Sequence, residues 1–548
     1  MKFRIYIIIQ IVFFGFLSHS CKRDDDEDLD KNRFAIDKSK IYIDDDYENR
    51  LKDSVWYYYK IVSLWETSLS PSISQIDKMD SLNYLKNNFT QYFQTAGDVL
   101  GYLMYQTKAS VVGNSLQSNV GSGNNFSFYR DILFSHKDGE SKAYDWYSYL
   151  DRGGFITGAI QNGYITGFGM DLTYIQQGIS DENPTLFVRF VEKNSSAYLA
   201  GLRRGDQIIS LNGDTKIDYN TQKNKNFSSL SNYLNAPNLT VVYKNEKGSH
   251  STLLQYSANW YADPLFIDTV LTAGDKRIGY LGLSTFISTN AFVSDRGVVK
   301  SFQSRLTEAF DKLVAGNVSE CVVDLRYNGG GSVYTAEYLA NLLSPTSASG
   351  KLMYTSKINQ ILKNMGWDEP GEDFAPVYFS KMGSLNLSKV YFLVSEETAS
   401  ASELLINVLS PYMRVYLIGN YKYDGNQTIA TRTYGKPVGS FPIELVSSNN
   451  ELYAISFQMF NKDGFGDYFD GLKPNTHVWE FKSFLDFGNQ QESLLASALA
   501  HIKTGSFETT YSRSVLPSTP IERNFSIRGV SERKIRGMYK FPHKKIRF

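Results

Sequence analysis

Two segments of the chain carry residues that together could catalyse a hydrolysis. Residues 398–403 read Thr-Ala-Ser-Ala-Ser-Glu and place Ser400 between two alanines. Residues 433–439 read Thr-Tyr-Gly-Lys-Pro-Val-Gly and place Lys436 among glycines and largely apolar neighbours. A lysine whose amine is neutral because it is desolvated can replace histidine as the base that activates a serine. The pair therefore indicates nucleophilic catalysis by serine.

Each segment also has an interpretation without catalysis. Ser400 and Glu403 have the spacing of a helix capping box, and Lys436 could be a solvated turn residue. The small side chains of Ala399 and Ala401 favour catalysis, because they let a substrate backbone approach closely. None of the six histidines lies in a turn typical of a catalytic triad, and no clustered Cys and His spacing offers a metal site. We therefore expect neither a metal nor a cofactor.

A third segment could hold the negative charge that develops during acyl transfer. Residues 324–332 read Asp-Leu-Arg-Tyr-Asn-Gly-Gly-Gly-Ser, so that a strand runs into three glycines. Successive N–H groups without side chains, here around Gly330 and Gly331, can bind an anion or a carbonyl oxygen. No Gly-Lys-Ser/Thr follows, which argues against a phosphate.

The elements around these segments alternate between strand and helix from residue 276 onward. Such alternation predicts an α/β domain with a largely parallel sheet, whose sites lie at the carboxyl ends of the strands. The predicted strands are residues 277–284, 321–325, 390–394 and 415–418, and the predicted helices are residues 298–314, 334–343 and 402–409.

Residues 158–257 have short apolar runs divided by turns, with strands expected at 164–172, 185–190, 207–211 and 239–243 and a short helix at 226–234. This part resembles a PDZ domain, on the evidence of Gly-Phe-Gly-Met at 167–170, of Ser-Ser-Ala-Tyr-Leu-Ala-Gly-Leu-Arg-Arg-Gly-Asp at 195–206 and of Asn-Gly at 212–213. PDZ domains bind a peptide C-terminus by strand addition. The resemblance implies that the backbone of Phe168, Gly169 and Met170 holds the terminal carboxylate.

The three catalytic segments in this order, behind a PDZ-like block, resemble the C-terminal processing, or tail-specific, serine peptidase family over roughly residues 145–503. The resemblance implies a crotonase-like catalytic domain with Ser400 as nucleophile and Lys436 as general base. It also implies oxyanion donors from the backbone of Gly330, Gly331 and Ala401.

Two departures from the family pattern concern the lysine. The separation of 36 residues between Ser400 and Lys436 is longer than usual, and residues 422–427 look like an inserted surface loop, so that Lys422 is a rival base. Some family members orient the lysine with a Gln four residues later, where this chain has Ser440. Glu403 or a backbone carbonyl could take over that support.

The overall charge and the N-terminal segment indicate which partners and which cellular location to expect. The 57 basic and 57 acidic side chains cancel, so the overall charge does not indicate a nucleic acid partner. Lys2 and Arg4 precede an apolar run, and Cys21 follows it as in a lipoprotein signal. The junction resembles a bacterial lipoprotein cleavage site, which implies lipidation of Cys21, a membrane anchor followed by an acidic tether, and an outer-membrane location in the cell envelope, either surface-exposed or periplasmic. Ordinary secretion and an uncleaved anchor are the alternatives. The remaining cysteine, Cys321, is expected to be a buried apolar residue.

We expect a multidomain α/β protein that cleaves exported proteins or peptides with free C-termini. The alternatives are an inactive relative that only binds peptides through its PDZ domain, and an acyl-transfer enzyme on the same scaffold. The basic C-terminal tail is expected to bind an acidic surface or to lack fixed structure. The predicted divisions are a signal at 1–21, a tether at 22–46, a helical region at 47–157, a PDZ domain at 158–257, a catalytic domain at 258–505 and the tail at 506–548.

Overall fold

The computed structural model describes residues 40–42, 46–69, 85–107 except 87, 145–507 except 146, 296, 424 and 426, 519–523, and 537–546 except 545. The signal segment with Cys21 and most of the tether lie outside these residues. The chain forms two compact units, one of residues 1–151 with 443–455 and the other of residues 152–442 with 456–548. Within the described residues, no helix combines the length and apolar character that crossing a membrane requires.

The described residues of the first unit include two α-helices, both within the region 47–157 that was expected to be helical apart from the first residue of α1. Helix α1, Asp46–Val62, buries Val55, Trp56 and Tyr59 completely. Helix α4, Ala96–Gln106, begins with a capping box in which Thr95 and Asp98 exchange hydrogen bonds. The short strand β1, Tyr149–Asp151, pairs antiparallel with residues 451–453 of β21, Ser447–Asn461.

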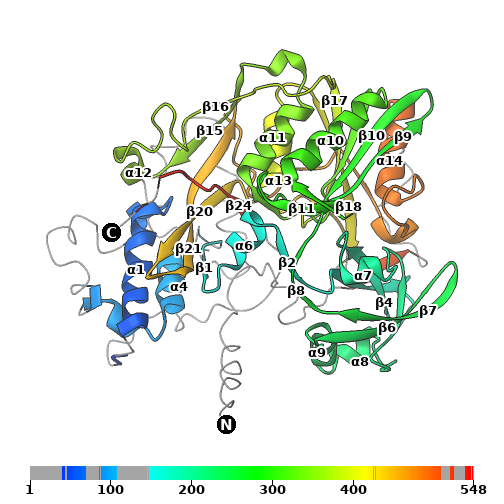
Figure 1. The fold of residues 1–548 in the computed structure, drawn as a ribbon, viewed down its shortest axis with the longest axis horizontal. Helices are drawn as coiled ribbons and strands as arrows, with labels where there is room; N and C mark the ends of the chain where they lie inside the picture. The colour runs from blue at the N-terminus through cyan, green and yellow to red at the C-terminus, as the bar shows by residue number, and fades with distance from the viewer. Residues whose placement is uncertain are drawn as a thin grey trace, which may run out of the picture. The chain divides into compact units, whose positions relative to one another are not determined.

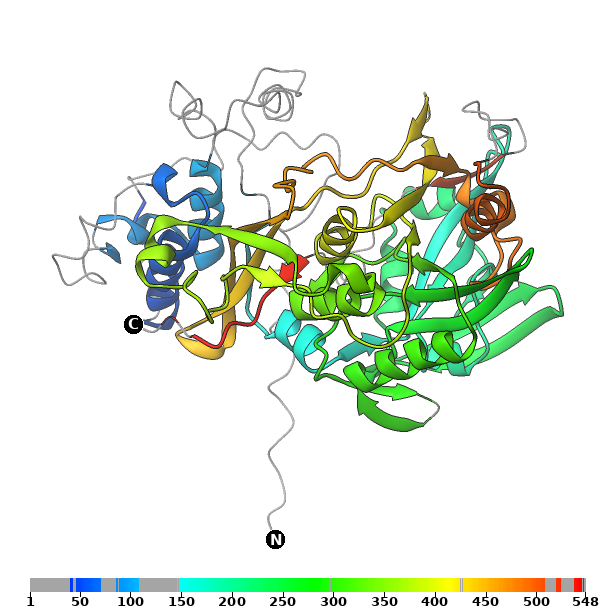
Figure 2. The ribbon, with the colours of Figure 1, turned by 90° about the horizontal axis from the view of Figure 1, so that it is seen from above.

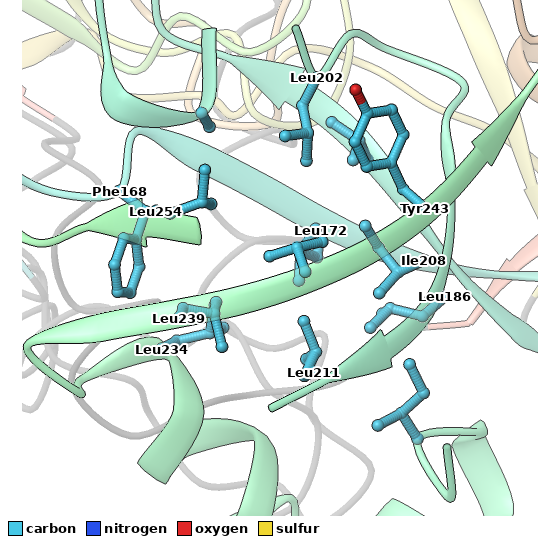
Figure 3. Packing of buried hydrophobic residues seen from close by; sticks show 14 of the residues in the cluster. Phe168, Leu172, Leu186, Leu202, Ile208, Leu211, Leu234, Leu239, Tyr243 and Leu254 are labelled. Carbon is cyan, nitrogen blue, oxygen red and sulfur yellow. The ribbon is translucent and has the colours of Figure 1, made fainter. Parts of the chain in front are cut away.

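The second unit begins with the PDZ-like part, where a glycine divides the strand expected at 164–172. The chain forms β2, Tyr164–Gly167, then turns at Phe168 and Gly169 and continues as β3, Met170–Gln177. Phe168 packs into the apolar core of this part together with Leu172, Leu186 and Leu239 (Figure 3). The other elements are β4 Thr185–Val191, α7 Ser196–Leu199, β5 Gln207–Leu211, α8 Tyr219–Lys223, α9 Ser228–Leu234, β6 Asn238–Asn245, β7 Gly248–Gln255 and β8 Ser257–Tyr261.

The predicted parallel sheet is present in the rest of this unit (Figure 1). Four strands, β10, β13, β17 and β18, run parallel in that order, and β22 continues the parallel set beyond β18. Only the flanking strands β9 and β19 are antiparallel to their neighbours. The strands are β9 Leu265–Ala273, β10 Lys276–Leu283, β13 Glu320–Asp324, β17 Lys389–Leu393, β18 Arg414–Tyr423, β19 Thr428–Ala430 and β22 Thr476–Val478.

Helices cover both faces of this sheet, with α14, Ser493–Thr504, on one and α10, Phe302–Ala315, on the other (Figure 2). The helix expected at 298–314 was predicted too long. Its first residues form β12, Val298–Ser301, which pairs with β11, Phe292–Asp295, as a hairpin with Gly297 at φ +81°. Two further helices start at the carboxyl ends of strand segments, namely α11 Val333–Leu343 and α13 Ala401–Leu409.

The C-terminal tail contributes two strands to the second unit, so the expectation that the tail lacks fixed structure is wrong for these residues, whereas its binding to an acidic surface stays a prediction. Strand β23, Pro520–Arg523, pairs with β3, and β24, Gly537–Tyr539, pairs with β14, Gly330–Ser332. Strand β24 also pairs with Ser440 of β20, Val438–Leu445 (Figure 1). The remaining α-helices and strands of the second unit are α6 Phe155–Gln161, β15 Leu352–Ile358, α12 Gln360–Asn364 and β16 Val377–Tyr378.

Candidate active site

Ser400 stands at a sharp turn between β17 and α13. Its backbone has φ 62° and ψ −111°, a conformation that residues with a side chain rarely adopt. The side chain is fully buried, and its Oγ has no hydrogen-bond partner in the part of the chain that the structure describes. Ser400 and Glu403 do have the capping-box arrangement that their spacing predicts, and Glu403 accepts a hydrogen bond from the Ser400 N–H at 2.7 Å, but the Ser400 hydroxyl itself makes no hydrogen bond among the described residues. A strained backbone that presents an unused hydroxyl is typical of a nucleophile.

Asn328 holds the turn of Gly329, Gly330 and Gly331 (the glycine turn) against the turn at Ser400 (the serine turn). Its carbonyl oxygen accepts from Ala399 N–H at 3.1 Å and from Ser402 Oγ at 3.2 Å. Its side-chain amide donates to Leu283 O at 3.1 Å, and its Oδ1 accepts from Gly330 N–H at 2.9 Å. One buried residue therefore sets the position of both segments that the sequence singled out.

Gly330 and Gly331 lie where no side chain would fit. Gly330 has φ +104°, and a Cβ there would stand 2.9 Å from both Ala399 O and Ala401 N. Gly331 has φ +131°, and its Cβ would stand 2.1 Å from Phe286 O. The glycine turn thus lies directly against the start of α13, where helix N–H groups concentrate positive charge.

Glu403 connects the serine turn to the lysine segment. Its fully buried carboxylate accepts from Ser400 N–H at 2.7 Å, from Gly435 N–H at 2.8 Å and from Lys436 N–H at 2.9 Å. It also accepts a hydrogen bond from the Thr433 hydroxyl. Burial raises the pKa of Glu403, and these donors act in the opposite direction. Glu403 therefore positions Lys436 through the backbone.

The two candidate lysines lie in different surroundings. Lys436 is 3 % exposed. The segment 433–436 packs closely on residues 469–472, because neither Gly435 nor Gly471 has a side chain at the contact. Lys422 lies on the hairpin of β18 and β19, where its Nζ contacts Glu396 Oε1 at 2.8 Å. Of the segment expected to be an inserted loop, residues 422 and 423 belong to β18, and β19 begins just after the segment. Ser440 is buried on β20, next to β24.

Sequence reasoning missed several residues of this site. Asn328 and Thr433 were quoted within motifs but given no role, although both hold the segments together. Tyr468 was not noticed at all, and its buried hydroxyl has no hydrogen-bond partner among the described residues. Burial and the nearby Glu403 carboxylate raise the pKa of Tyr468. No local pattern marks this tyrosine, because its place in the site depends on the fold.

Buried charges brace the strand that leads into the glycine turn. Arg326 is 1 % exposed and contacts Asp324 at 2.8 Å and Glu492 at 2.6 Å. Arg204 of the PDZ-like part reaches Glu480 at 2.9 Å and the hydroxyl of Tyr327 at 2.7 Å. These pairs hold the carboxyl end of β13 in one arrangement.

The PDZ-like turn has the close packing that its glycine permits. Gly169 has φ +74°, and a Cβ there would lie 2.1 Å from the Cβ of Ser195. The carbonyls of Phe168 and Gly169 accept from Ala197 N–H at 3.1 Å and from Glu192 N–H at 2.8 Å. Met170 then opens β3, and the turn precedes it as in a carboxylate-binding loop.

Other candidate groups do not form a second reaction centre. Cys321 is fully buried in β13, and burial raises its thiol pKa to about 12, as expected for a structural cysteine. Across the residues that the structure describes, there is no group of three or more His, Cys, Asp or Glu side chains that could hold a metal ion.

The α/β part and the PDZ-like part each match a known domain family. Residues 277–478 match the family model Peptidase family S41, and residues 166–229 match the PDZ domain model. The chain therefore carries both domains and is similar to the carboxyl-terminal processing peptidases.

Two known proteins illustrate the similarity. The chain is 26% identical over 277 residues to carboxyl-terminal-processing peptidase 1, chloroplastic, of Arabidopsis thaliana, which covers 50% of this chain and 47% of that relative. The match thus spans about half the length of the plant protein. A crystal structure from Bacteroides fragilis NCTC 9343, described as an S41 protease, has a TM-score of 0.56 at 23% identity and covers 82% of this chain and 97% of that one. At that identity the likeness concerns the fold alone.

Proposed function

We propose that the chain is a serine endopeptidase that uses Ser400 as nucleophile and Lys436 as general base. The observation that carries the proposal is the strained turn at Ser400, whose buried Oγ makes no hydrogen bond within the described part of the chain. The carboxylate of Glu403 binds the backbone N–H of both Ser400 and Lys436, which supports their joint action. Lys422 is the weaker candidate, because Glu396 pairs with its ammonium.

In the proposed reaction the neutral amine of Lys436 takes the proton of the Ser400 hydroxyl while Oγ attacks a peptide carbonyl carbon. The tetrahedral intermediate then collapses, and the leaving amine takes that proton from the Lys436 ammonium. Water attacks the resulting ester with Lys436 again as base, which releases the acid and restores Ser400. No other group needs to change its protonation.

The oxyanion would be held by backbone N–H groups beside Ser400. The N–H of Gly330 already donates to Asn328, so its role is to shape the turn. Ala401 N–H, the first of helix α13, lies against that turn and is the donor best supported by its position. The N–H of Gly331 is a further candidate donor, but it could bind an oxyanion only after β24, which pairs with β14, is displaced.

We further propose that the PDZ part captures the C-terminus of an unstructured protein at the turn of Phe168, Gly169 and Met170. The match to the PDZ model over residues 166–229 supports this role. Location at the outer membrane through a lipid on Cys21 is likewise a proposal. Exchange of Cys21 for Ser would then release the protein from membranes, and retention on the membrane would argue against the anchor.

The test of the activity is hydrolysis of reduced, carboxymethylated casein by purified protein. We expect slow cleavage by the full chain and none by the Ser400→Ala variant, with Ser410→Ala as a matched control that stays active. Cleavage that survives Ser400→Ala at the same rate would refute the assignment. Binding without cleavage by any variant would instead favour the peptide-binding alternative.

A further inference from the structure

The tail occupies the strand edge at which PDZ domains add a peptide. Strand β3 has β4 on one side, and β23 pairs antiparallel with it on the other. Pro520 lies opposite Gln177 and Arg523 opposite Tyr174, so the tail runs toward the turn that opens β3. A peptide whose C-terminus enters a PDZ groove has this direction.

The side chains of β23 are bound as well as its backbone. Ile521 is 2 % exposed, and Glu522 accepts from Thr173 Oγ1 at 2.6 Å. Arg523 Nε donates to Gln176 Oε1 at 2.5 Å. The segment thus contacts β3 as a ligand strand would, with alternate side chains recognised on each face.

The same tail also lies between β14 and β20, where β24 pairs with both strands beside the turn at Ser400. Gly537 N–H donates to Gly329 O at 3.0 Å, and Lys540 N–H donates to Ser440 O at 3.1 Å. In a parallel ladder with this register the carbonyl of Gly537 faces the N–H of Gly331. Gly537 O also lies 2.5 Å from the point where a Cβ of Gly330 would stand, and Ala401 N lies 2.9 Å from that point. The tail therefore brings a peptide carbonyl next to the proposed oxyanion donors.

A pocket for a lysine side chain anchors this second segment. Lys540 is 2 % exposed, and its ammonium lies 5.6 Å, 5.7 Å and 5.4 Å from the ring centres of Tyr334, Tyr354 and Phe374. Its Nζ donates to Tyr354 Oη at 3.3 Å, and that hydroxyl donates in turn to Glu337. Burial lowers the pKa of Lys540, while the carboxylates of Glu337 and Asp373 favour its charged form.

Charged contacts continue beyond Lys540. His543 N–H donates to Asp373 Oδ2 at 2.9 Å, and Lys544 contacts Glu372 Oε1 at 2.8 Å. An aromatic pocket with carboxylates around it is a chemical match for one ammonium group on an extended peptide.

We propose that the C-terminal tail is an internal peptide ligand, which occupies the free edge of β3 and the space between β14 and β20 and is held by Lys540 in an aromatic lysine-binding pocket, and that a substrate binds by displacing it. The expected effect of displacement on hydrolysis rests on the proposed function, whereas the binding of the tail to these strands does not. This pocket fits extended peptides that carry a lysine. That lysine lies three residues after the peptide residue that takes the place of Gly537. Release of the tail raises the fraction of molecules competent to bind them.

The test compares full-length variants that weaken the tail. Lys540→Glu sets a carboxylate against Glu337 and Asp373, and Ile521→Asp places a charge in the buried contact with β3. Lys462→Glu is the matched control, because it reverses an exposed lysine elsewhere in the unit. Circular dichroism verifies folding, and Lys540→Met, which keeps the stem but removes the charge, replaces Lys540→Glu if that variant unfolds.

Two readouts separate this proposal from the proposed function. The first is binding of a fluorescent peptide copying residues 533–543 to proteins that all carry Ser400→Ala. We expect at least a tenfold lower Kd when Lys540→Glu is added, and no change with Lys462→Glu. The second is casein hydrolysis with Ser400 intact, which we expect to increase about tenfold with Lys540→Glu and also to increase with Ile521→Asp.

Each outcome has a defined meaning. Tighter peptide binding without hydrolysis by any variant supports the internal ligand and removes the proposed function. Unchanged peptide binding overturns the internal ligand. Casein hydrolysis that falls in a folded Lys540→Glu protein also overturns it, because the tail would then complete the active site and not cover it.

Discussion

The substitution Glu403→Gln examines how one buried carboxylate can organise both halves of the proposed dyad. Oε1 accepts from the Thr433 hydroxyl and from Gly435 N–H, whereas Oε2 accepts from the N–H groups of Ser400 and Lys436. Glutamine keeps one acceptor oxygen and replaces the other with an amide NH₂. The oxygen will remain on the side of Ser400 and Lys436, because the Thr433 hydroxyl can rotate and accept from the NH₂.

Two donors are then affected: the Gly435 N–H loses its acceptor, and the Thr433 hydroxyl no longer donates to residue 403, although it can turn toward another acceptor. An unsatisfied buried donor costs about 1 to 3 kcal/mol, so we expect the free energy of unfolding to fall by about 2 kcal/mol. Alanine at the same position removes the acceptor of three N–H groups and leaves a cavity, so its cost exceeds about 4 kcal/mol. Glutamine should retain part of the reactivity of Ser400, whereas alanine should abolish it.

Urea unfolding gives the stabilities, and the rate of labelling of Ser400 by a fluorophosphonate probe reports on the site. Glu369→Gln, an exposed position, is the control and should change stability by less than about 0.5 kcal/mol. Equal losses of stability and labelling for glutamine and alanine at Glu403 would refute the reasoning. Unchanged labelling in the alanine variant would show that Glu403 does not position the dyad.

Three further outcomes follow from the geometry. Gly330→Ala should lower stability by about 2 to 4 kcal/mol and abolish casein cleavage, because its Cβ would meet backbone atoms at 2.5 Å to 2.9 Å; normal activity would contradict this. Lys436→Ala should slow cleavage by about 10² to 10⁴, whereas Lys422→Ala should change it less than about threefold; the reverse order would make Lys422 the base. Burial raises the pKa of Glu192 from 4.5 to about 7. Between pH 4.5 and pH 7 the folded chain keeps a proton on Glu192 that the unfolded chain has released. The free energy of unfolding therefore falls as the pH rises through this range. Glu192→Gln should therefore match the parent at pH 4 and exceed it by about 2 kcal/mol at pH 8 in urea unfolding, since Ser284 keeps an acceptor; equal stability at pH 8 would contradict the buried proton.

The parallel strands were predictable because local composition specifies them. Cys321, Val322 and Val323 form a buried apolar run between polar residues, and the structure has β13 at Glu320–Asp324. The helix expected from residue 298 was misjudged because Gly297 makes a turn that pairs Val298 and Val299 with the preceding strand. Both a helix and a strand accept the apolar Val298 and Val299, and the turn at Gly297 makes them a strand.

The site was predictable only where its residues adjoin one another in a motif. Ser400 and the glycine turn were found from such motifs, and their roles as nucleophile and oxyanion site remain predictions. The backbone contacts from Glu403 to Lys436, the bridging role of Asn328 and the burial of Tyr468 depend on segments distant in sequence. The strands of the tail were not foreseen, because pairing partners more than a hundred residues away leave no local pattern.

The most direct test of the central claim is peptide mapping by mass spectrometry after treatment with a fluorophosphonate probe. The full chain and its Lys540→Glu variant are treated, each with and without Lys436→Ala. We expect a single adduct on Ser400 in both proteins, formed faster in the variant and lost with Lys436→Ala. An adduct on another serine, or one on Ser400 that persists at full rate without Lys436, would contradict the account.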